Sequence, residues 1–212
     1  MVRITHWITA LCFAALLLSG IEIVISHPRF YWGETGTVLT PPLFQLPIPS
    51  SRKLVPTGYA YVLPDQNGWS RALHFEAAWI VVLTGVLYVI AGLVTKHFQQ
   101  HLVPTKTDPS WRANDATSYN GPQRLAYLFV IFVLFPLVIW TGLAMSLAFE
   151  AACSTCVVVL GGRQSARTIH FFVAAALLLF LCVHVVQVWR AGFWNRTGAM
   201  ITGRLNIRKE SA

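Results

Sequence analysis

Four long apolar stretches constrain the fold more than any other feature of this sequence. They cover roughly residues 4–26, 72–95, 124–148 and 168–189. Each is long enough to cross a bilayer core of about 30 Å as an α-helix, which takes about 20 residues. The stretches are continuous and rich in Leu, Ala and Phe, without the alternation that transmembrane β-strands show. The sequence therefore predicts an all-α fold, a transmembrane four-helix bundle, and excludes an outer-membrane barrel.

The composition excludes the main alternatives to a membrane protein. Hydrophobic residues make up 55% of the 212 residues and charged residues only 11%, whereas roughly a quarter of a soluble protein is charged. A disordered chain would be far less hydrophobic, and the four cysteines are too few for a disulfide scaffold. The formal net charge of +8 does not indicate nucleic-acid binding, because the Lys and Arg residues flank apolar stretches.

The flanking charges predict how the helices are oriented, because cytoplasmic loops carry an excess of Lys and Arg. Ten of the 16 basic residues fall on the side of the two termini, and six fall on the other side. The ten are Arg3, Lys96, Lys106, Arg112, Arg124, Arg190, Arg196, Arg204, Arg208 and Lys209; the six are Arg29, Arg52, Lys53, Arg71, Arg163 and Arg167. We therefore expect a multi-pass protein of the bacterial inner (plasma) membrane with both termini in the cytoplasm.

The chain divides into a predicted four-helix domain, residues 1–195, and a basic cytoplasmic tail, residues 196–212. One Arg precedes the first stretch and no small-residue cleavage site follows it, so we expect a retained helix rather than a removed signal peptide. The outer loop, residues 27–70, holds seven of the eleven prolines and many aromatic residues. It is either an irregular cap over the helix ends or a docking surface for a partner.

Four of the seven histidines fall within or at the ends of the spans. An ionisable side chain is costly inside a membrane and usually has a function there. His170 and His184 are fourteen residues apart, which places them on one helix face about 21 Å apart along the axis. The first span runs from the cytoplasmic side outward, which puts His6 at the inner edge. The second span runs inward, which puts His74 at the outer edge. The topology therefore pairs His74 with His170 near the outer face and His6 with His184 near the inner face.

Two imidazoles that face each other across a helix bundle can ligate the iron of a b-type haem from both sides. Two such pairs predict two haems stacked across the membrane, with these four histidines as the iron ligands. Each haem carries propionates, and an arginine stands one helical turn before three of the ligands. We expect these arginines to contribute to cofactor binding: Arg3 before His6, Arg71 before His74 and Arg167 before His170.

The spans also resemble a known family. The segments that carry the resemblance are RITHWITALCFAALLLSG, ALHFEAAWIVVLTGVLYVIAG, YNGPQRLAYLFVIFVLFPLVIWTGLAMS and RTIHFFVAAALLLFLCVHVVQVW. Together they resemble the di-haem cytochrome b subunits of bacterial respiratory oxidoreductases, such as those of nickel-iron hydrogenase, formate dehydrogenase and thiosulfate reductase. The resemblance covers roughly residues 1–195 and implies an electron-transfer subunit with the same two histidine pairs.

This resemblance also implies a substrate and a partner. Quinone or quinol would exchange near the inner haem, around His184 with Arg3, Trp7 and Gln187. The outer loop is longer than in the hydrogenase type and is similar to members that accompany a periplasmic molybdopterin oxidoreductase subunit. We therefore expect membrane lipid, quinone and such a redox subunit as partners, and no nucleic acid. The short chain before His6 leaves the inner haem thinly covered unless the true start lies upstream or a tail folds over it.

Other residues carry weaker signals. Cys153 and Cys156 form a C-x-x-C pair in an outer segment, which favours a disulfide over a redox-active dithiol. His97 and His101 have helical spacing but no acidic or cysteine partner, so a metal site there is disfavoured. Pro136 is expected to kink the third span.

Two rival functions remain open. One is a stand-alone superoxide-to-quinone oxidoreductase that uses the same haems, and the other is a membrane anchor without haem. No nucleophile motif, phosphate-binding loop or metal-hydrolase spacing is found, which excludes hydrolytic and phosphoryl-transfer chemistry.

Overall fold

A computed structural model describes residues 2–37, 39–48, 67–103 and 121–203 of the chain. Residues 49–66 of the predicted outer loop and residues 204–212 of the predicted tail lie outside the described residues. The same holds for seven of the basic residues used to predict orientation: Arg52, Lys53, Lys106, Arg112, Arg204, Arg208 and Lys209.

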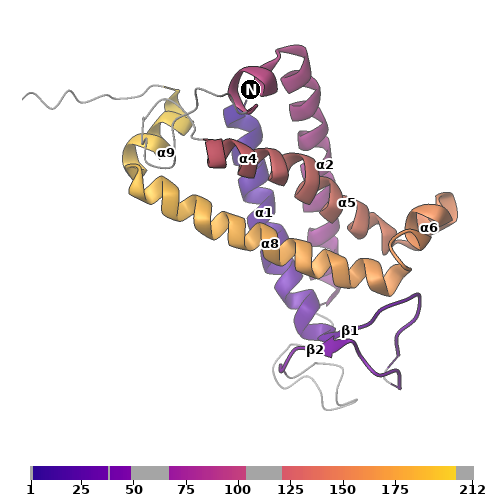
Figure 1. Ribbon diagram of the computed structural model, residues 1–212. Helices are drawn as coiled ribbons and strands as arrows, with labels where there is room; N and C mark the ends of the chain where they lie inside the picture. The colour runs from indigo at the N-terminus through magenta and orange to yellow at the C-terminus, as the bar shows by residue number, and fades with distance from the viewer. Residues whose placement is uncertain (1, 38, 49–66, 104–120, 204–212) are drawn as a thin grey trace, which may run out of the picture.

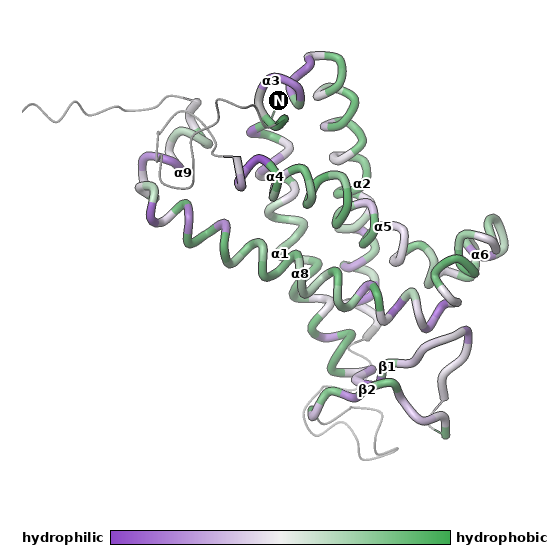
Figure 2. Tube along the Cα trace, in the orientation of Figure 1, coloured by the Kyte–Doolittle hydropathy of each residue, from purple (hydrophilic) through white to green (hydrophobic). Residues whose placement is uncertain are grey.

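Within the described residues, four helical segments are long and apolar enough to cross a membrane, as the sequence predicts. They are α1 (Val2–Ser26), α2 (Asn67–Val94), the composite third span and α8 (Arg163–Arg190) (Figure 1). Hydrophobic residues dominate all four spans (Figure 2). Large apolar side chains therefore remain exposed along them, as expected where the surrounding solvent is lipid.

The third span is built from three pieces that follow one another without a break. Helix α4 (Gly121–Phe129) continues into a π-helical turn, η1 (Val130–Leu134), and then into α5 (Phe135–Ala144). Pro136 has no N–H and its ring would clash with the carbonyl group four residues earlier, at Phe132. A π-helical turn widens the helix at this point and accommodates the proline. The distortion expected from Pro136 thus takes the form of a π-helical turn.

The spans pack as two helix pairs, α1 with α2 and α5 with α8. One cluster joins Val130 and Leu134 of the third span to Val173 and Leu177 of α8, and Phe13 of α1 packs against it. A second cluster joins Cys12 of α1 to Ala77 and Val81 of α2, and Phe135 of α5 packs against that one. Apolar contacts of this kind hold both helix pairs together as one bundle.

The described part of the outer loop forms a cap on the first turns of α8. Strands β1 (Arg29–Phe30) and β2 (Phe44–Gln45) pair antiparallel, with Phe30 opposite Phe44, so a minimal sheet accompanies the helices. The Phe30 ring is buried and lies 4.6 Å from the Phe171 ring of α8, centroid to centroid. The Gly33 N–H donates to Ser165 Oγ at 2.7 Å, and Thr168 Oγ1 donates to the Tyr31 carbonyl at 2.7 Å.

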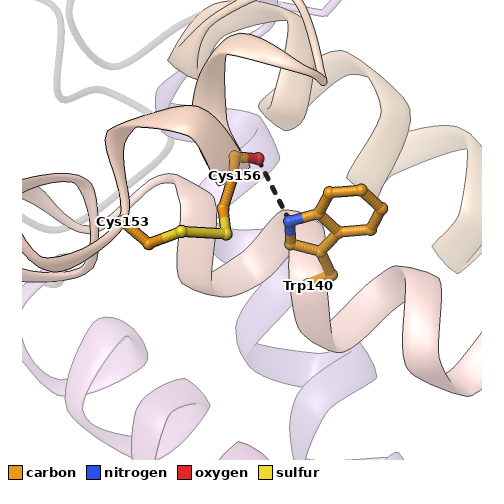
Figure 3. Close-up of a disulfide and its surroundings, with 3 residues drawn as sticks. All are labelled: Trp140, Cys153 and Cys156. Atoms are coloured by element: carbon orange, nitrogen blue, oxygen red, sulfur yellow. Dashed lines mark hydrogen bonds between the residues drawn. A yellow bond between two sulfur atoms is a disulfide. The ribbon is translucent and has the colours of Figure 1, made fainter.

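Three helices of five or six residues lie between the spans of the described chain. Helices α6 (Leu147–Ala152) and α7 (Ser154–Val158) connect α5 to α8, so the third span ends at Ala144 and not at residue 148. Cys153 and Cys156 form a disulfide here, which confirms the interpretation of the C-x-x-C pair. Trp140 Nε1 donates to the Cys156 carbonyl at 3.1 Å and ties this segment to α5 (Figure 3). Helix α3 (His97–His101) follows α2.

The final helix, α9 (Phe193–Thr202), includes residues that the sequence analysis placed in a solvated tail. It lies near the N-terminus of the chain (Figure 1). Trp7 Nε1 of α1 donates to the Met200 carbonyl at 3.2 Å, and Arg3 Nη1 donates to the Ile201 carbonyl at 3.5 Å. Helix α9 therefore packs over the start of α1, the helix that carries His6.

Candidate haem sites

The four histidines of the spans lie in two groups. The imidazole centroids of His74 and His170 are 6.2 Å apart, and those of His6 and His184 are 6.3 Å apart. We call the first group the loop-side pair, because it lies toward the end of the bundle that the outer loop caps. We call the second the terminus-side pair, because α9 covers that end. These are the two groupings that helix direction and depth predict.

The loop-side pair is oriented by two buried hydroxyl groups. Ser19 Oγ of α1 lies 3.0 Å from His74 Nδ1, and it donates its own proton to the Ala15 carbonyl at 2.7 Å. A hydroxyl has one proton, so Ser19 accepts a hydrogen bond from a protonated Nδ1 of His74. The other ring nitrogen, Nε2, then keeps its lone pair and is available as a metal ligand.

The same arrangement recurs at His170. Thr141 Oγ1 of α5 lies 3.1 Å from His170 Nδ1 and donates its proton to the Leu137 carbonyl at 2.7 Å. The Val138 carbonyl, which can only accept, is 3.0 Å from the same Nδ1. His170 Nδ1 therefore also carries a proton, and its Nε2 is likewise free to bind a metal.

A glycine follows each of these hydroxyl residues and lies against the histidine ring. A methyl group at Gly20 would come within 3.6 Å of His74 Cε1, and one at Gly142 within 3.3 Å of His170 Cε1. At Gly142 any side chain would push the ring, because such a contact is tighter than ordinary van der Waals packing. Ser19–Gly20 and Thr141–Gly142 thus form two equivalent hydroxyl–glycine pairs, one for each loop-side histidine.

The terminus-side pair has aromatic neighbours instead of hydroxyl groups. The Phe180 ring stacks on the His184 ring at 6.0 Å, and the Tyr127 ring meets it edge-on at 6.3 Å. The Trp7 ring meets the His6 ring edge-on at 5.3 Å. His6 Nδ1 is buried and has no hydrogen-bond partner among the residues that the structure describes. His6 Nδ1 therefore lacks a hydrogen bond like those that fix the two loop-side rings.

Both pairs fit the dimensions of a haem with two axial histidines. An iron–nitrogen bond of about 2 Å on each side, plus about 1 Å from each nitrogen to its ring centroid, separates the centroids by roughly 6 Å. The observed separations of 6.2 and 6.3 Å meet this requirement. The free Nε2 atoms of the loop-side pair supply the donor chemistry that haem iron requires there.

Comparisons with known proteins decide the family. The family model described as "Prokaryotic cytochrome b561" matches residues 1–203, which is almost the whole chain. The chain belongs to this family. A member is a membrane cytochrome b that takes part in electron transport and binds b-type haem, so the resemblance stated above is confirmed at the level of the family.

One curated relative of this cytochrome is a protein of Azospira oryzae named as a candidate protein-methionine-sulfoxide reductase subunit, YedZ1. The two sequences are 27% identical over 209 residues, which covers 88% of this chain and 86% of the relative. No solved structure gives a significant match.

The three candidate arginines of the cytochrome lie in different surroundings. Arg3 contacts α9, and Arg71 is exposed on α2. Arg167 is half-buried, donates to the His27 carbonyl and lies over the Phe30 ring at 5.1 Å. It therefore anchors the outer loop in this structure, and its role toward a propionate, like that of Arg3 and Arg71, stays a prediction.

A groove of about 400 Å³ lies between the first turns of α1 and the end of α9. Arg3, Trp7 and Leu11 line it from α1, and Met200 and Ile201 line it from α9. Two of the three residues that the resemblance implies for quinone are therefore in this groove. The third, Gln187, is exposed on α8 and does not line it.

Sequence reasoning missed part of this arrangement. The part that it missed is the contact of Ser19, Gly20, Thr141 and Gly142 with the two loop-side histidines. The sequence feature that could have indicated these contacts is a hydroxyl residue followed by glycine inside an apolar span. It occurs in both the first and the third span. His97 and His101 both lie on α3, and among the described residues no three metal-binding side chains gather there or elsewhere.

Proposed function

We propose that this cytochrome carries electrons across the bacterial inner membrane between quinone and a redox partner, through one haem b at each histidine pair. The observation that supports this most is the presence of two histidine pairs, with ring centroids 6.2 and 6.3 Å apart, at opposite ends of one bundle. His170 and His184 share α8 and are about 21 Å apart along its axis. Haem supplies reversible one-electron chemistry when it is bound.

The polypeptide would hold, orient and insulate the two cofactors. His74 with His170 and His6 with His184 would supply the axial nitrogens. The Ser19 and Thr141 hydroxyl groups fix the protonated nitrogen of the loop-side ligands. Between the two pairs, the apolar cluster around Leu134 and Leu177 would exclude water from the bundle interior.

We place the terminus side in the cytoplasm and the loop side in the periplasm, following the excess of Lys and Arg on the terminus side. A partner would then dock on the face formed by the outer loop. The described part of this loop contacts the start of α8, where Arg163 Nε is 3.0 Å from Glu34 Oε1 and Ser165 Oγ accepts from the Gly33 N–H. Such a cap provides a defined surface rather than a loose connection.

The partner we propose is a periplasmic molybdopterin-type oxidoreductase subunit. Two arguments support it: the length of the outer loop, and the relative whose name describes a methionine-sulfoxide reductase subunit. A reductase consumes electrons, so the net direction would be from quinol on the terminus side to the partner on the loop side. A stand-alone superoxide-to-quinone enzyme would need no such partner and no capped outer loop.

We place quinol in the groove between α1 and α9. Arg3 offers a guanidinium donor to a quinone oxygen, and Trp7 and Leu11 offer apolar contact to the ring and tail. Leu11 is 72% exposed, so a larger side chain fits there without disturbing the bundle.

The experiment that tests this placement fills the groove. Leu11→Trp should slow quinol-driven reduction of the haems by about tenfold or more, because the indole occupies the space of the quinone ring. The readout is haem absorbance after addition of a short-chain quinol, with dithionite as a reductant that needs no groove. Leu18→Trp is the matched control, because Leu18 is also exposed on α1, at 61%, and lies outside the groove. Equal rates in the two variants would refute the placement.

A further inference from the structure

The two histidine pairs differ in one respect that bears on their redox properties. Both loop-side histidines place Nδ1 against a hydroxyl oxygen from another helix, at 3.0 Å for His74 and 3.1 Å for His170. On the terminus side, His6 Nδ1 has no hydrogen-bond partner within the described residues, and His184 packs against aromatic rings. The difference is therefore one of hydrogen bonding to the ligand rings.

The Ser19 and Thr141 hydroxyl groups can only accept a hydrogen bond from the histidines. Ser19 and Thr141 are both fully buried, at 0% exposure. Each donates its only proton to a carbonyl of its own helix at 2.7 Å, from Ser19 to Ala15 and from Thr141 to Leu137. Neither hydroxyl can then donate to the histidine, so each must accept from Nδ1–H.

A hydrogen bond from Nδ1–H makes the imidazole a stronger electron donor at its other nitrogen. A stronger donor stabilises ferric iron relative to ferrous iron and lowers the reduction potential of the haem that it ligates. A backbone carbonyl also accepts from each ring, Leu16 for His74 and Val138 for His170, so removal of one hydroxyl weakens the hydrogen bonding of the ring without abolishing it.

We propose that Ser19 and Thr141 are positioning residues that set the reduction potential of the loop-side haem and make it the more reducing of the two. They act through His74 and His170 and do not touch the iron themselves. Gly142 leaves room for the His170 ring, which a side chain at this position would push. This inference rests on the proposed function, because it requires haem at both pairs.

The consequence is a difference in driving force between the two ends of the bundle. A lower potential makes the loop-side haem a stronger electron donor to an external partner, and it makes the preceding transfer from the terminus-side haem thermodynamically uphill. The hydroxyl–glycine pairs, Ser19–Gly20 and Thr141–Gly142, would thus give the loop-side haem a lower reduction potential than the terminus-side haem.

A redox titration that resolves both haems tests the proposal. Ser19→Ala and Thr141→Val should each raise the potential of the loop-side haem, with the terminus-side haem unchanged. We expect the reduction equilibrium constant to change by about tenfold for the double variant, which is about 59 mV for a one-electron couple. The g-values of the ferric loop-side haem should shift as well, because the ligand field changes.

The controls separate a specific effect from a general loss of packing. Ser19→Thr and Thr141→Ser keep the hydroxyl group, so the loop-side haem of each variant should have the wild-type potential. Thr84→Val removes another buried hydroxyl, on α2, with the same change of shape as Thr141→Val. It should leave both potentials in place. In Thr141→Val the Val138 carbonyl still accepts from His170 Nδ1 and keeps the ring oriented. The potential of this variant is therefore the readout if Ser19→Ala does not retain the haem.

Three outcomes overturn the inference: unchanged potentials in the double variant, equal shifts of both haems, or a wild-type loop-side haem of higher potential than its counterpart. The loop-side haem is identified as the one that His74→Ala removes. Haem content is measured on the same samples. Fewer than two haems in the wild-type protein would refute the proposed function itself, whereas two haems with unmoved potentials would refute only the role of Ser19 and Thr141.

Discussion

Replacing His170 with Ala should remove one haem and leave the other in place. The centroids of the His170 and His74 rings are 6.2 Å apart, and a haem held by two axial histidines loses half of its iron–protein bonds when one is removed. His74→Ala should therefore give the same product, with the haem-to-chain ratio falling from two to one. The measurement is haem content per chain, with the reduced-minus-oxidised spectrum identifying the haem that remains.

Double variants make this prediction sharper. His74→Ala with His170→Ala should still retain one haem, because both changes affect the same site. His74→Ala with His184→Ala should retain none. His97→Ala, on α3 and outside both pairs, is the control and should keep two haems. If His74→Ala together with His184→Ala kept one haem, the pairing by depth would be wrong.

Replacing His184 with Ala should disconnect quinol from the loop-side haem. The variant keeps the loop-side pair, but it lacks the ligand that would hold a cofactor beside the groove between α1 and α9. Quinol-driven reduction of the remaining haem should fall by about a hundredfold or more, which corresponds to roughly 2.7 kcal/mol in the activation free energy. Dithionite should still reduce that haem completely. The measurement is stopped-flow absorbance of the purified variant.

His74→Ala is the matched variant for this experiment. It should keep quinol-driven reduction of the terminus-side haem at the wild-type rate, because the groove and His6 are untouched. If quinol reduced the loop-side haem of the His184 variant at the wild-type rate, quinol would have to react on the loop side. The proposed direction of transfer would then have to be abandoned.

Much of the fold could be predicted from the sequence, because membrane spans are defined by hydrophobicity and length. The four spans were predicted within a few residues at most ends. The grouping of His74 with His170, and of His6 with His184, followed from helix direction alone. That argument needs no contact information, since a helix that starts on one side must present its first residues there.

Features that depend on tertiary contacts could not be predicted. Helix α9 is short and contains Gly198, so its local signal is weak, and its hydrogen bonds to Trp7 and Arg3 come from the far end of the chain. The role of Thr141 depends on which face of α5 meets α8, which periodicity does not specify in a helix that is apolar all round. The third span ended early because Ser146 adopts an extended backbone conformation.

The central claim is that each chain holds two haems, one at each histidine pair. The most direct test is the haem content of the purified wild-type protein, measured as the pyridine haemochrome and divided by the polypeptide concentration from amino-acid analysis. We predict two haem b per chain. A value of one, or a colourless protein, would contradict the account.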